Sequence, residues 1–258
     1  SLLRRVFGFW AIAKHSTAGL EEVLVERFGS KTLGDLKHRV LVPAVNYSTG
    51  RGQFFKTPHH PRFELDHRIR LVDVALATAA APVYFPLARN DRGVFADGGL
   101  VGNAPGLFGL HEVRHFLATT EPVRVRVLSI GTMTIGTTIR GNAALDRGFG
   151  LWGGKLFDLV ISAQESSVDY MLRHSLGSDY FRIDDEATPE QSQDVKALDR
   201  VSKASTETLK HRGRHAAQRA LGDAGFAPFR AHRARPARFF HGPNKNSAQS
   251  TGDFNAEP

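Results

Sequence analysis

Residues 94–105 read VFADGGLVGNAP, a short apolar run followed by an Asp-Gly-Gly turn. Its first three residues are apolar and predict a short strand. The strand runs directly into Asp97, and Gly98 and Gly99 follow, so the chain is expected to turn sharply there. In open α/β sheets a residue just beyond a strand lies at the edge where ligands bind. Asp97 is therefore a candidate catalytic residue, although Asp-Gly pairs are also common in plain turns.

Expected helices and strands alternate on both sides of this stretch. The expected helices are 18–28, 71–81, 104–117, 151–174 and 194–221, and the expected strands are 39–46, 53–56, 94–96, 123–130 and 180–183. Pro43 argues against a fully paired central position for strand 39–46, because proline cannot donate a hydrogen bond to the ladder. The alternation predicts an α/β fold with a mainly parallel sheet.

The composition excludes several classes of protein. Hydrophobic residues make up 41% of the 258 residues and charged residues 23%, which is typical of a globular chain. The absence of cysteine excludes a disulfide scaffold, a thiolate metal site and a cysteine nucleophile. The longest apolar stretch without charge, 74–87, is shorter than the roughly 20 residues of a membrane-spanning helix. We expect a cytoplasmic location, with peripheral membrane contact left open.

Three other motifs that would carry chemistry are incomplete or absent in the sequence. Residues 111–115 read HEVRH and match H-E-x-x-H, in which two histidines bind zinc. A catalytic zinc needs a third protein ligand, and none follows at a recognisable spacing, so no metal is predicted. The sequence contains no G-x-S-x-G serine elbow, and Ser16 and Ser48 lie in unsuitable contexts. The glycines at 148–154 do not follow a strand in dinucleotide-binding register, so no cofactor is expected.

The net charge of +8 is concentrated near the C-terminus. Residues 209–241 contain eight Lys or Arg and one acid, Asp223. Such a segment can contact an anionic membrane or a nucleic acid, or it can be a solvated helix followed by a loose tail. Aromatic residues are few in it, so a nucleic acid is not the favoured partner.

Four motifs, in order along the chain, resemble the patatin-like phospholipases, a family of serine lipid acyl hydrolases. Residues 77–86 (ATAAAPVYFP) resemble the family's A-A-P-x-Y-F-P segment, and residues 97–99 resemble its D-G-G motif. Residues 103–105 (NAP) resemble its N-x-P motif. Residues 127–132 (VLSIGT) resemble its S-x-G-T-G strand, except that Met133 replaces a glycine. The resemblance runs from Ser16 to Asp184 and is placed on the C-terminal two-thirds of the family's domain.

The resemblance implies a serine–aspartate dyad in which Asp97 accepts the serine proton, with Gly98 and Gly99 as the supporting turn. The oxyanion loop and the serine elbow are expected to precede residue 1. The expected fold is thus an incomplete three-layer α/β/α patatin-like domain with its N-terminal strands missing. Residues 1–222 would form this partial domain, and residues 223–258 a poorly ordered basic tail.

The function implied is hydrolysis of lipid or phospholipid esters, of the phospholipase A or esterase type, with no cofactor and no metal. Because the nucleophile is expected upstream, the chain alone is predicted to be inactive. The alternative is a catalytically inactive fragment or binding module that contacts anionic lipid.

Overall fold

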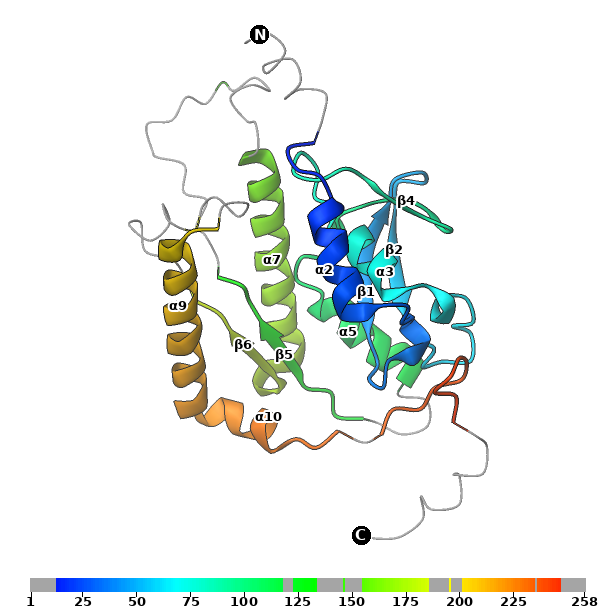
Figure 1. Cartoon of the computed structure of the whole chain (residues 1–258). Coiled ribbons are helices and arrows are strands. Elements are labelled where there is room, and N and C mark those ends of the chain that lie inside the picture. The colour runs from blue at the N-terminus through cyan, green and yellow to red at the C-terminus, as the bar shows by residue number, and fades with distance from the viewer. Residues whose placement is uncertain are drawn as a thin grey trace. The chain divides into compact units, whose positions relative to one another are not determined.

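The computed structural model describes residues 13–117, 123–133, 146, 155–185, 195, 201–234 and 236–246. The chain divides into two compact units. Figure 1 shows their helices and strands. Unit 1 comprises Ser1–Gly102 and Ala234–Pro258, and unit 2 comprises Asn103–Arg233. Each unit has its own sheet and its own apolar core, so the α/β class predicted from the sequence is confirmed.

Unit 1 is built on a four-stranded antiparallel sheet with the strand order β2-β1-β4-β3. Its strands are β1 (Leu41–Asn46), β2 (Arg51–Lys56), β3 (Ala88–Asn90) and β4 (Gly93–Ala96). Its helices are α2 (Ala18–Phe28), η1 (Leu33–Asp35), η2 (Asp66–Arg68), α3 (Leu71–Thr78) and α4 (Gly99–Gly102). The predicted mainly parallel sheet is wrong for this unit. The short connections 47–50 and 91–92 fold consecutive strands back on each other, and such hairpins are antiparallel.

The core of unit 1 lies between this sheet and helix α3. Phe55 of β2 and Phe95 of β4 are both fully buried, with ring centroids 5.3 Å apart. Helix α3 packs on β1, β3 and β4 through its buried residues, and α2 packs on α3. The small residue Ala77 is completely buried in this core, as expected of a tightly packed helix. The packing holds the end of β4 against the end of α3.

Pro43 lies in the part of β1 that β4 does not pair with. β1 pairs with β2 along its whole length, but it pairs with β4 only at Val45 and Asn46. The carbonyl of Pro43 instead accepts a hydrogen bond of 2.7 Å from the hydroxyl of Thr78. A Cβ on Gly98 would collide with this carbonyl oxygen and lie 2.8 Å from the Thr78 hydroxyl. The residue after Asp97 must therefore be glycine.

Unit 2 contains a parallel pair of strands, β5 and β6, connected through a long helix. Its elements are α5 (Gly106–Glu112), the π-helix η3 (Val113–Leu117), β5 (Val127–Ile130), α7 (Lys155–Leu176), η4 (Gly177–Asp179), β6 (Tyr180–Ile183), α9 (Lys203–Gly222), η5 (Ala224–Phe226) and α10 (Ala227–Ala231). The buried residues Leu110, Leu172 and Tyr180 form its core. In the described part of the chain, no helix combines the length and the apolar character needed to cross a membrane.

Residues 236–246 return to unit 1 and pack on it as a strap. Phe239 is 4% exposed, and the backbone N–H of Phe240 donates to the carbonyl of Pro58 at 2.8 Å. The side-chain amide of Asn244 donates to the carbonyls of Gly34 and Leu36 at 3.1 and 3.2 Å. This part of the expected loose tail is therefore anchored by specific contacts. The predicted domain boundary at residue 222 stays a prediction.

Gly98→Ala is expected to destabilise unit 1 by about 1–3 kcal/mol, because the added methyl meets backbone atoms of Pro43 that cannot easily move. Urea unfolding of the purified variant measures this loss. Gly109→Ala in α5 is the matched control, since nothing lies within 4 Å of its Cβ position. The control is expected to be neutral or slightly stabilising. Equal effects of the two substitutions would contradict the close approach at Gly98.

Phe239→Ala is expected to lower the free energy of unfolding by about 3 kcal/mol, because it leaves a cavity under the strap. Leu65→Ala in the same unit is the control, since Leu65 is 64% exposed and is expected to change stability by under about 0.5 kcal/mol. Thermal unfolding followed by circular dichroism compares the two. A Phe239 variant as stable as the control would show that the strap does not contribute to the fold.

Candidate active site

The backbone of Asp97 is held by the end of helix α3. Asp97 follows directly after β4, as the sequence predicts, and its N–H donates to the carbonyl of Ala80 at 3.0 Å. The N–H of Gly98 donates to the carbonyl of Thr78 at 3.1 Å. Residues 77–86 thus have a structural role in the candidate site, because the carbonyls of Thr78 and Ala80 position the Asp97 turn.

The carboxylate of Asp97 is half-buried and faces its own turn. The N–H of Gly99 donates to Asp97 Oδ1 across 2.6 Å. Among the described residues, no second hydrogen-bond donor reaches this carboxylate. Its other oxygen, Oδ2, therefore remains able to accept a proton. Gly98 and Gly99 therefore support Asp97 in two ways: Gly98 by fitting against Pro43, and Gly99 by donating its N–H.

Burial raises the pKa of Asp97 above its ordinary value, and the hydrogen bond from Gly99 opposes this rise. Burial acts in this direction because it removes water from the charged form. A carboxylate with a raised pKa is a stronger base, and general bases work best when their pKa approaches the working pH. The raised pKa is the direction expected for a general base, and the role of Asp97 as the base stays a prediction.

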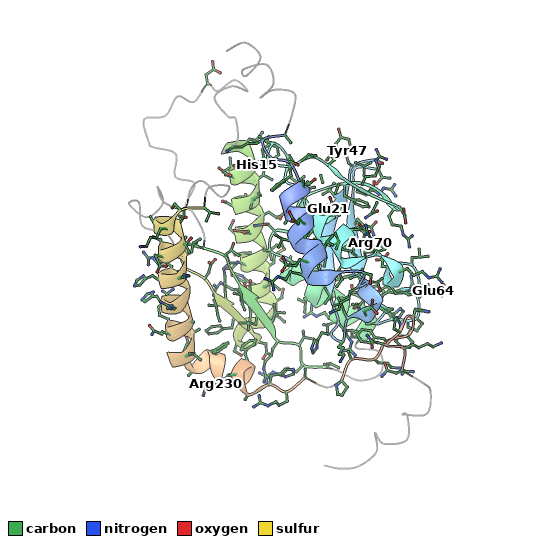
Figure 2. The ribbon with its side chains drawn as sticks, viewed as in Figure 1. His15, Glu21, Tyr47, Glu64, Arg70 and Arg230 are labelled. Atoms are coloured by element: carbon green, nitrogen blue, oxygen red, sulfur yellow. The ribbon has the colours of Figure 1, made fainter. Side chains whose placement is uncertain are left out.

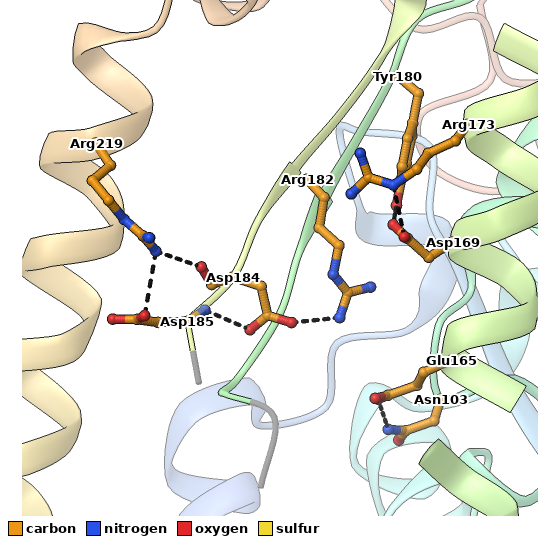
Figure 3. A network of polar contacts seen from close by, with 9 residues as sticks. All are labelled: Asn103, Glu165, Asp169, Arg173, Tyr180, Arg182, Asp184, Asp185 and Arg219. Atoms are coloured by element: carbon orange, nitrogen blue, oxygen red, sulfur yellow. Dashed lines mark hydrogen bonds and ion pairs between the residues drawn. The ribbon is translucent and has the colours of Figure 1, made fainter. Parts of the chain in front are cut away.

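Asn103 and Pro105, the other residues of this motif, belong to unit 2 and contact helix α7. The N–H of Asn103 donates to Gln164 Oε1 at 2.9 Å, and its side-chain amide donates to Glu165 Oε1 at 2.5 Å (Figure 3). Pro105 is the N-cap of α5. The N-x-P motif therefore connects the start of α5 to α7. The sequence did not reveal this structural role.

The H-E-x-x-H stretch does not assemble a metal site in the part of the chain that the structure covers. The rings of His111 and His115 lie with their centroids 4.3 Å apart, and Glu112 is buried at 5% exposure. Across the described ranges, no group of three or more His, Cys, Asp or Glu side chains could hold a metal ion. Two adjacent histidines alone do not complete a catalytic zinc site.

Unit 2 contains a network of ion pairs that the sequence analysis missed (Figure 3). Arg182 of β6 pairs with Asp184, and Arg219 of α9 donates to the Asp184 carbonyl at 3.0 Å and to Asp185 Oδ1 at 3.3 Å. An open pocket of about 580 Å³ lies beside this network. It is lined by Ser162, Glu165, Ser166, Asp169, Arg173, Arg182, Asp184, Asp185 and Arg219. The sequence signal that could have revealed this network was the acidic pair Asp184 and Asp185, directly after the strand 180–183.

A second pair in the same pocket joins α7 to β6. Asp169 accepts hydrogen bonds from Arg173 Nε at 2.7 Å and from the Tyr180 hydroxyl at 2.8 Å. Burial favours the neutral form of Asp169, but these two donors lower its pKa below the ordinary value. Like Arg182 and Arg219, Arg173 is therefore already paired with a carboxylate, which reduces the net charge of the pocket wall.

Some basic side chains of the segment 209–241 are also paired with carboxylates. Arg212 of α9 lies 3.4 Å from Asp185 and its side chain is 17% exposed, so it is not directed to solvent. Arg214, Arg230, Arg233 and Arg238 are exposed. Contact of this segment with an anionic membrane stays a prediction.

Comparison with known proteins finds the patatin-like phospholipase family model over residues 2–107. A cGAMP-activated phospholipase of Pseudomonas aeruginosa is 77% identical over 246 residues, which covers 95% of this chain and 74% of that protein. A cGAMP-activated phospholipase of Vibrio cholerae is 41% identical over 203 residues, covering 72% of this chain and 56% of that protein. Patatin-like protein 3 of Arabidopsis thaliana is 30% identical over 149 residues, covering 46% of this chain and 35% of that protein.

These matches correct two expectations from the sequence. The motifs place the resemblance on residues 16–184 as a C-terminal portion, and this is wrong because the family model matches residues 2–107, at the N-terminal side of the chain. The expectation of missing N-terminal strands has no support. The prediction that the chain alone is inactive is also contradicted, since 95% of it aligns at 77% identity with a phospholipase.

The resemblance to lipid hydrolases is confirmed at the level of the family. The match over residues 2–107 includes Asp97 and both glycines of its turn. The high identity extends the relationship over nearly the whole chain and over three-quarters of a known phospholipase. The chain belongs to the patatin-like phospholipase family.

Proposed function

We propose that this chain hydrolyses the acyl ester bonds of phospholipids and that Asp97 is the general base. The observation that carries this proposal is the half-buried carboxylate directly after β4, with one oxygen bound by Gly99 and its pKa raised by burial. The phospholipid substrate is supported by the relatives from Pseudomonas and Vibrio, which are both named as phospholipases.

In the proposed reaction Asp97 takes the proton from the hydroxyl of the nucleophilic serine that the family resemblance implies, and the serine oxygen attacks the ester carbonyl. No G-x-S-x-G elbow in residues 1–258 identifies that serine, so the proposal assigns a residue only to the base. The bond between the carbonyl carbon and the alcohol oxygen then breaks, and the protonated carboxyl returns the proton to the leaving alcohol. Water hydrolyses the acyl-enzyme by the same route, with Asp97 again as base. The hydrogen bond from Gly99 to Oδ1 keeps the carboxylate in one orientation, so that Oδ2 is the proton acceptor.

Activation by cGAMP is part of the proposal, because both close bacterial relatives are named for it. A phospholipase that is active without restraint would damage the cell's own membranes. An activator that shifts the enzyme toward its competent state must bind that state more tightly than the resting state. The assay for this chain therefore includes cGAMP.

Asp97→Asn is expected to reduce phospholipid hydrolysis by about 10³-fold or more, because the amide cannot accept the serine proton. Fatty-acid release from phosphatidylglycerol vesicles, with and without cGAMP, measures the loss. Asp91→Asn is the matched control: Asp91 is exposed in the turn between β3 and β4. Retained hydrolysis in the Asp97 variant, or an equal loss in the control, would contradict the assignment of the base.

The same substitution is expected to stabilise the fold at neutral pH. The pKa of Asp97 is raised in the folded chain, so keeping the charged form buried costs free energy above that pKa. Asp97→Asn removes this cost, and its advantage shrinks as the pH falls and the wild-type carboxyl becomes protonated. Urea unfolding at about pH 7 and about pH 4.5 measures the change. A stability difference that is constant or grows toward acid pH would show that burial does not raise the pKa.

A further inference from the structure

The loop that follows helix α3 exposes apolar side chains. Residues 82–87 read PVYFPL, and Val83, Tyr84 and Leu87 are 54%, 36% and 42% exposed. Scattered apolar residues are normal on a protein surface, but several in one short loop form a patch that favours contact with an apolar partner. The neighbouring Phe85 is half-buried, and its ring centroid lies 5.9 Å from that of His15.

The backbone of this loop is strained at Val83. Its φ of 73° is in the left-handed region, which a β-branched residue rarely adopts. Hydrogen bonds hold it there: Lys14 N–H donates to the Val83 carbonyl and His15 N–H to the Tyr84 carbonyl, both at 2.9 Å. His15 lies in the segment before α2 (Figure 2). A strained residue that is also exposed and apolar does not serve the core, which points to function.

The loop is connected directly to the candidate base. The carbonyl of Ala80 accepts the N–H of Asp97, and the carbonyl of the next residue, Ala81, accepts the N–H groups of Tyr84 and Phe85. A surface bound by the loop would therefore lie near the residue that is proposed to act on the ester.

The charges around the loop suit a phospholipid surface. The stretch from Val74 to Asn90 contains no acidic residue and one basic residue, Arg89. Lys14 Nζ lies 5.7 Å from the centre of the Tyr84 ring. Lipid phosphates would meet positive charge here, while aromatic and aliphatic side chains are suited to the boundary between headgroups and acyl chains.

We propose that loop 82–87 is a membrane-binding loop that inserts Val83, Tyr84 and Leu87 into the surface of a phospholipid bilayer. Arg89 would contact the lipid phosphates beside it. The proposal rests on the proposed function in one respect: a phospholipid substrate requires the enzyme to meet a bilayer. It assigns the contact to this loop rather than to the basic segment 209–241.

Val83→Asn tests the proposal with little risk to the fold, because asparagine adopts the left-handed conformation more readily than valine. The full chain is mixed with vesicles of ether-linked phosphatidylcholine, which contains no ester to hydrolyse, and the bound fraction is measured by flotation. We expect the partition coefficient to fall by about tenfold or more while the melting temperature is unchanged or higher. Val23→Asn is the matched control, since Val23 lies on α2 and is 52% exposed.

Wild-type-like binding of the Val83 variant would overturn the proposal, and so would an equal loss in the Val23 control. Vesicles with added phosphatidylglycerol provide a second readout. Binding that follows the anionic fraction and the salt concentration alone, and not the Val83 substitution, would assign the contact to the basic segment and also overturn the proposal. If the chain hydrolyses no ester-linked lipid but the Val83 variant still loses vesicle binding, the proposed function fails and the membrane-binding loop stands.

Discussion

The close contact of Gly98 with the carbonyl of Pro43 is the constraint on which the candidate site depends. Because no side chain separates them, the turn after β4 reaches the part of β1 that β4 itself does not pair with. Thr78 completes the contact by donating its hydroxyl to the same carbonyl. Three segments distant in sequence thus meet at one backbone oxygen. Asp97, one residue away, takes its position from this junction.

Asp97 is partly buried beside this junction, and burial raises its pKa. A carboxylate on an open turn would be fully solvated, whereas this one is partly covered and receives one hydrogen bond from its own turn in the described structure. Burial strengthens it as a base and makes the charged form less favourable. Such a compromise between stability and activity is common at catalytic residues. The neighbouring loop shows a similar compromise, since Val83 keeps a strained conformation.

The local parts of this arrangement could be predicted from the sequence. The apolar residues before Asp97, the glycines after it and the strand 180–183 all lie where the pattern places them. The sheet of unit 1 was predicted wrongly, because strand direction depends on pairings such as Val45 with Ala96 that local periodicity does not encode. The strap around Phe239 was missed for a similar reason: its partners are some 200 residues away in sequence. The contacts of Asp185 with α9 likewise join distant residues.

The pKa of the Asp97 carboxyl is the most direct test of Asp97 as the general base. Carbon-13 NMR of a sample labelled at the aspartate carboxyl carbons, titrated with acid and assigned by the signal missing from Asp97→Asn, measures it residue by residue. We predict a pKa above the ordinary aspartate value of 3.8. A pKa at or below that value would show that the turn stabilises the charged form more than burial opposes it. Asp97 would then lack the raised proton affinity that its proposed role as general base requires.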